Sequence, residues 1–93
     1  MKMKGDVVTV VTMMGEVVGR LKEETSTGYV IESPRLFVPA PDSSAGGFAP
    51  GLSMTGKQDL SDATVNKSVV LTVIPTHHDV EAGWIQATSG IVV

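Results

Sequence analysis

The sequence predicts an all-β fold, a small and strongly bent antiparallel barrel of five strands. Apolar residues make up 42% of the chain and aromatic residues only 4%, so the core must consist mainly of Val, Ile, Leu and Met, and β-branched residues favour strands. Short apolar runs alternate with turn residues, and no sustained helical stripe is present. Glycines stand at an expected turn and in the middle of an expected strand, as a bent sheet requires. The length fits one domain over residues 1–93.

The first two strands are expected to form a hairpin. Residues 6–14, DVVTVVTMM, are apolar at odd and even positions, as in a strand that is buried on both faces. Gly15 permits a tight turn with a positive φ. The second strand covers residues 16–24, and Gly19 in its interior indicates strong curvature or the close approach of another backbone.

The third strand follows the polar turn TSTG and runs from Tyr29 to about Ala40. Pro34 lies within it and indicates an edge position or a bulge. Residues 40–67 are rich in proline and glycine and are expected to form a long, flexible inserted loop.

Two further strands complete the predicted sheet. Residues 68–76, SVVLTVIPT, form the fourth, which Pro75 ends. After the polar turn HHDVEAG, residues 84–93, WIQATSGIVV, form the fifth. The apolar character of both strands, in a chain with little helix to cover them, points to assembly with other subunits.

The stretch VVTVVTMMGEVVGRLKEETSTGYVIE resembles the first motif of Sm-like proteins, the family of LSm and Hfq proteins. An apolar strand is followed by Gly15, by Gly19 four residues later and by Leu21 two residues further. The resemblance covers about the first third of the chain and is greatest to divergent, small Sm-like proteins of phages. It implies a closed homo-oligomeric ring of about five to eight subunits, in which the fourth strand of one subunit pairs with the fifth of its neighbour.

The ring that this resemblance implies places the last two strands at the subunit boundary. Trp84 is either an anchor of this interface, which we expect, or a core residue. The residues expected at the oligomer interface are Val70, Leu71, Val73, Trp84, Ile85 and Ile91.

RNA is the ligand that the resemblance implies, but the usual uridine pocket is altered. Family members carry an aspartate, a stacking side chain and an asparagine where this chain has Thr25, Gly28 and Tyr29. Tyr29 either stacks on a base or packs at a subunit interface. The formal net charge of -3 also argues against strong phosphate binding. The candidate residues for binding single-stranded RNA are Arg20, Lys22, Thr25, Tyr29 and Arg35.

Three other features suggest weaker candidates. His77 and His78 stand beside carboxylates and are possible metal ligands, although adjacent side chains of an extended chain point to opposite faces, which favours a solvated turn. Phe48, in the glycine-proline loop, either contacts a protein partner or packs back onto the barrel. No nucleophile, base and oxyanion donors occur together, so we expect neither an enzyme nor a cofactor.

Two functions are therefore open: an Sm-like ring that binds RNA without the usual uridine pocket, or a structural or protein-interaction ring, such as a phage assembly or host-modulating component, without nucleic acid. The absence of cysteine fits a reducing compartment, and we expect a cytoplasmic protein without membrane contact.

Overall fold

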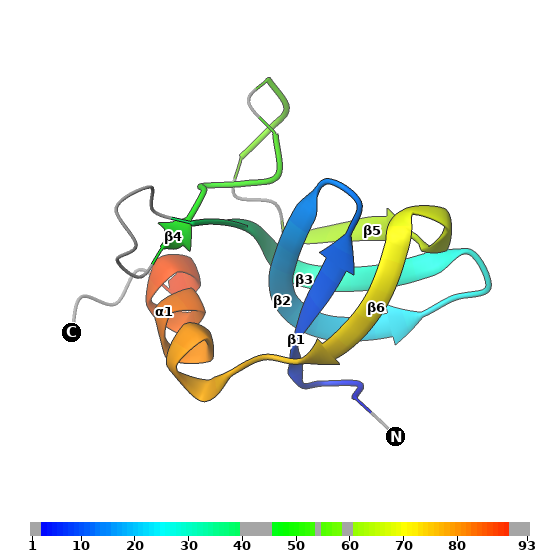
Figure 1. The fold of residues 1–93 in the computed structure, drawn as a ribbon, viewed down its shortest axis with the longest axis horizontal. Helices are drawn as coiled ribbons and strands as arrows, with labels where there is room; N and C mark the ends of the chain where they lie inside the picture. Colours follow the sequence, from blue (N-terminus) through cyan, green and yellow to red (C-terminus); the bar gives the residue numbers. More distant parts are fainter. Residues whose placement is uncertain (1–2, 40–45, 54, 59–60, 90–93) are drawn as a thin grey trace.

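A computed structural model describes residues 3–39, 46–53, 55–58 and 61–89 (Figure 1). Within these residues the chain forms a mostly antiparallel sheet followed by one C-terminal helix. None of the described helices is long and apolar enough to cross a membrane. In chain order the elements are β1 (Val7–Thr12), β2 (Gly15–Glu24), β3 (Gly28–Val38), β4 (Gly47–Phe48), β5 (Asp62–Asn66), the 3-10 helix η1 (Lys67–Val69), β6 (Val70–Pro75) and α1 (His78–Ser89).

The sheet is bent but open. Its strands follow the order β4-β3-β2-β1-β6, and β5 pairs with β3 beside this path. Figure 1 shows β1 and β6 crossing β3 and β5, with α1 packed to one side. In the described part of the chain β5 and β6 are joined through η1 but not paired, so the expected closed barrel is seen only as a strongly bent antiparallel sheet.

Strand β1 is buried on both faces, which confirms the interpretation of its apolar pattern. Val8 and Val10 are fully buried in one cluster, while Val7 belongs to a second cluster on the opposite face. Antiparallel pairing with β2 on one side and β6 on the other encloses the strand. The first cluster also contains Val17, Leu21 and Ile31, and the second contains Val18 and Trp84.

The expected close approach at Gly19 is confirmed. A Cβ atom there would collide with Ile31 Cγ2 and would lie 2.8 Å from the carbonyl oxygen of Glu32, closer than Cβ atoms approach such neighbours in real structures. Gly15, with φ at +144°, takes the positive φ expected for the hairpin turn. The tight contact at Gly19 explains how β2 and β3 come together where the sheet bends.

The expected irregularity at Pro34 is a bulge in β3. Val18 pairs with Arg35 and Arg20 pairs with Glu32, so Ser33 and Pro34 stand opposite Gly19 alone. Ser33 has a φ of 51°, in the left-handed region. Beyond this bulge β3 changes partner, because it pairs with β5 over residues 28–32 and with β4 at residues 37–38.

The fifth strand predicted over residues 84–93 is wrong where the structure describes it, because α1 extends to Ser89. His77 stands directly before the helix, and its carbonyl accepts the first helical hydrogen bond from the amide of Glu81, 2.9 Å away. The carboxylates of Asp79 and Glu81 lie in the first turn, where their negative charge interacts favourably with the positive end of the helix dipole. These local signals, together with burial of Trp84, override the β-branched composition.

The segment 40–67, expected to be one long flexible loop, contains two strands. β4 pairs with the end of β3, and β5 pairs with its beginning. In β5, the half-buried Ala63 and Val65 alternate with exposed polar residues, which is the period of a strand with one face on the core. The insertion therefore contributes to the sheet.

Candidate functional site

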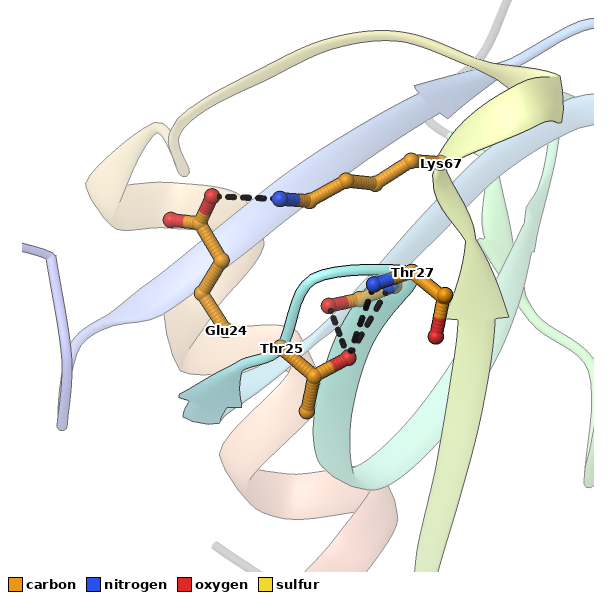
Figure 2. A network of polar contacts seen from close by, with 5 residues as sticks. Glu24, Thr25, Thr27 and Lys67 are labelled. Carbon is orange, nitrogen blue, oxygen red and sulfur yellow. Dashed lines mark hydrogen bonds and ion pairs between the residues drawn. The ribbon is translucent and has the colours of Figure 1, made fainter.

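The turn between β2 and β3, where RNA-binding residues were expected, is held by its own hydrogen bonds (Figure 2). The hydroxyl oxygen of Thr25 accepts the backbone amides of Thr27, at 3.3 Å, and Gly28, at 3.0 Å. The same hydroxyl donates to the carbonyl of Gly28, at 3.1 Å. Thr25 therefore fixes the turn, and its hydroxyl is occupied within the chain.

Tyr29 lies beside a lysine that sequence reasoning did not select. The ammonium of Lys67 is 5.4 Å from the centre of the Tyr29 ring. It also lies 2.8 Å from Glu24 Oε2, an ion pair that Figure 2 shows. The hydrogen bond to Glu24 raises the pKa of Lys67. Its backbone amide donates to the carbonyl of Thr27, at 2.9 Å, which ties η1 to the turn. Both the base-stacking candidate and its nearest cation are thus engaged within the chain.

Each of the three basic candidates is engaged within the chain or buried. Lys22 is 2.8 Å from Asp62 Oδ2, and the hydrogen bond to Asp62 raises the pKa of the lysine. Arg20 donates to the carbonyl of Gly5, at 2.8 Å, and lies 5.6 Å from the centre of the Trp84 ring. Arg35 is only 4% exposed. A phosphate backbone would have to compete with these intramolecular contacts.

The apolar interface candidates occupy different environments. On β6, Leu71 is 69% exposed, whereas Val70 and Val73 are half-buried against the first core cluster. On α1, Ile85 is 42% exposed but Trp84 only 4%, and its indole donates to the carbonyl of Ser33, at 2.9 Å. Trp84 is thus a core residue of the single chain, the alternative to the interface role we expected. Ile91 lies outside the described residues.

Strand β6 presents one unpaired edge among the described residues. It pairs with β1 on one side only, and we call its other side the β6 edge, residues 70–75. Leu71 and Ile74 are exposed on this strand, at 69% and 45%. An exposed strand edge with apolar side chains is a template for pairing with a further strand, and no glutamate, aspartate or lysine within β6 opposes such pairing.

The tip of the β1–β2 hairpin adds apolar surface that sequence reasoning missed. Met13 is 71% exposed and Met14 is 91% exposed, at positions where hairpin turns usually carry Gly, Asn or Asp. The Met13 amide donates to the carbonyl of Val69, 3.1 Å away, so the tip lies against the end of η1, next to the start of β6. The sequence feature that could have indicated this apolar tip is the pair of methionines directly before Gly15.

A groove of about 420 Å³ opens beside this tip, and we call it the hairpin groove. Its wall is mainly apolar, and it runs from the hairpin to β5 and η1. Flexible methionine side chains are common where a surface adapts to a partner. The groove is lined by Thr12, Met14, Val17, Leu36, Leu52, Thr64, Val65, Asn66 and Val69.

Phe48 packs back onto the sheet, which is one of the two roles considered for it. Its ring meets Phe37 edge to face, with centroids 5.6 Å apart and an interplanar angle of 78°. It also packs against the second core cluster, which contains Trp84. Its half-buried side chain therefore links β4 to the helix-covered face.

His77 and His78 lie together with Asp79 at the start of α1, and the ligand atoms of the three residues all lie within 4.8 Å of one another.

Comparison of the chain with protein families, with curated proteins and with solved structures finds no match.

Proposed function

We propose that this protein is a structural module that assembles with copies of itself through the β6 edge into a homo-oligomeric ring. The ring is taken from the Sm-like resemblance, but α1 stands where that resemblance placed the fifth strand, so β6 would pair with a different strand edge of the neighbouring subunit. The observation that carries the proposal is that β6 pairs on one side only while Leu71 and Ile74 expose apolar side chains. Pairing with a second chain would satisfy the backbone of this edge and remove those side chains from water. The hairpin groove and the exposed methionines lie next to the start of β6 and extend the proposed contact surface.

The proposal predicts that wild-type protein at micromolar concentration has the mass of a multimer. In the double variant Leu71→Lys, Ile74→Lys we expect the mass of a monomer, because charged side chains on an edge strand oppose pairing. Size-exclusion chromatography with light scattering measures both. The control for added charge is Val38→Lys, which adds one lysine, half the charge of the double variant, at a side chain that is 49% exposed on β3.

Three results would contradict assembly through β6. A monomeric wild type would exclude the multimer itself, and an unchanged multimer in the double variant would place the contact on another surface. Loss of the multimer in Val38→Lys as well would show that added charge, rather than the β6 edge, causes the effect.

The second candidate, binding of single-stranded RNA, has less support. Lys22 and Lys67 are each paired with a carboxylate, and Arg20 is engaged by a backbone carbonyl and an indole. We therefore expect no salt-dependent change in fluorescence anisotropy when labelled oligo-U or oligo-A is titrated with the multimer at low and moderate salt. The opposite result would be salt-dependent binding that is weakened in Lys67→Gln and unchanged in Lys57→Gln. It would favour RNA binding over the structural role and would place RNA at the β2–β3 turn.

A further inference from the structure

The start of α1 brings three metal-binding side chains to one place. His78 Nε2 lies 3.0 Å from Asp79 Oδ1, and His77 Nδ1 lies 3.9 Å from Asp79 Oδ2. One ligand atom from each residue falls within a span of 4.8 Å. Two donors on the same tetrahedral zinc ion are about 3.3 Å apart, so small side-chain rotations would bring this set to ligand distances.

The local backbone explains why the two histidines are not on opposite faces. They stand where the chain leaves β6 and enters the helix, so the alternation of an extended strand does not apply. Their rings are stacked, with centroids 4.8 Å apart and an interplanar angle of 21°. The carboxylate of Asp79, in the first helical turn, lies within reach of both rings. The expectation that adjacent histidines point to opposite faces, which argued against a shared ion, therefore does not hold here.

We propose that His77, His78 and Asp79 bind one divalent ion of the zinc, nickel or copper type. Two imidazoles and one carboxylate suit these ions, whereas calcium and magnesium require sets made only of oxygen donors. All three side chains are exposed, between 65% and 86%, so an ion can enter directly and water can complete its coordination. The three residues follow directly after the β6 edge but are not part of it, and the proposal does not depend on assembly.

Metal binding at this place has a structural consequence for the helix. The backbone amide of Asp79 donates to His77 Nδ1, at 3.2 Å, so this imidazole also caps α1. An ion bound at Nδ1 takes the lone pair that the amide uses, and the cap is then released. Binding should therefore shift the amide resonance of Asp79, and not only the signals of the imidazole rings.

The chain is favourable for a direct test because His77 and His78 are its only histidines. We would titrate the protein with Zn²⁺ by calorimetry and add trace Cu²⁺ or Ni²⁺ while recording NMR spectra. We expect saturation at one ion per chain, selective broadening of both imidazole signals by the paramagnetic ions, and a shift of the Asp79 amide on addition of Zn²⁺.

Three variants decide whether the cluster is the site. His78→Ala and Asp79→Asn should each weaken Zn²⁺ binding by at least about tenfold, since each removes one of three protein donors. The matched control Glu81→Gln removes a carboxylate from the same first turn but outside the cluster, and its affinity should match that of the wild type. Circular dichroism of each variant checks that α1 is retained.

The proposal would be overturned if Zn²⁺ bound with equal affinity to wild type and His78→Ala, or if Glu81→Gln weakened binding as much as Asp79→Asn. The first result would place the ion elsewhere on the chain, and the second would show only general attraction to negative charge. Absence of binding at millimolar Zn²⁺ would also refute it.

Discussion

Replacing Trp84 with alanine is expected to lower the free energy of unfolding by about 3 to 5 kcal/mol, the usual cost of removing a large buried aromatic side chain. The indole is 4% exposed, packs with Val7 and Val18, and donates a hydrogen bond to the carbonyl of Ser33. Its loss would leave α1 without its only buried residue. Urea denaturation at a fixed protein concentration measures the change, because assembly, if it occurs as proposed, would make the apparent stability depend on concentration.

The matched control is Ile85→Ala, at the next position of α1, where the side chain is 42% exposed. We expect a change within about 0.5 kcal/mol for this control. If Trp84 were instead an interface residue on a fifth strand, its replacement would change the mass of the assembly and leave the stability of the separated subunit almost unaltered. That outcome would refute the position of α1.

Replacing Gly19 with alanine is the second change expected to have a large effect, about 1 to 3 kcal/mol of destabilisation. The added Cβ would meet the carbonyl oxygen of Glu32 at 2.8 Å, and a backbone atom cannot rotate away as a side chain can. Either the β2–β3 bend opens or the bulge at Ser33 and Pro34 moves. For a domain of this size such a loss is a large fraction of the total stability.

Gly47→Ala provides the control for Gly19→Ala. No atom lies within 4 Å of the position where a Cβ would be added at Gly47, so the same change in composition should leave the urea midpoint almost unaltered. Equal stability of Gly19→Ala and wild type would show that the strands do not approach as closely as the structure has them.

The sequence predicted the structure correctly where a steric or burial requirement restricts the residue types at a few neighbouring positions. The apolar residues at both parities of residues 6–14 predicted a strand enclosed on two sides, and the glycine and proline in neighbouring strands predicted the site of the bend. Each of these signals depends on a requirement that only a few residue types meet, such as the absence of a Cβ at Gly19.

The helix could not be predicted from composition because its strongest determinants are a cap and one long-range contact. Ile85, Thr88 and the glycine at position 83 are poor helix formers, and strand preference depends strongly on context. The hydrogen bond from the backbone amide of Asp79 to the His77 ring, together with the burial of Trp84 against β1 and β2, makes this segment helical. A tryptophan next to an apolar run indicates burial, but not which element carries it.

The candidate surface was found only in part. Leu71 was selected from its apolar strand, whereas Met13 and Met14 were read as the end of the first strand and not as an exposed turn. The basic candidates were chosen for charge, but the pairing of Lys22 with Asp62 depends on β5, a strand that the composition of the insertion concealed. Ion pairs between distant segments require knowledge of the strand order.

The pairing of β1 with β6 also determines when the molecule can finish folding. Val8 lies opposite Pro75 and Thr9 opposite Ile74, so β1 cannot complete its pairing until β6, far later in the chain, has been synthesised. During that interval the valines of β1 lack one of their two neighbouring strands. Contacts between such distant parts of a chain slow folding. Cellular yield of this protein should therefore depend on synthesis rate and chaperone supply as well as on final stability.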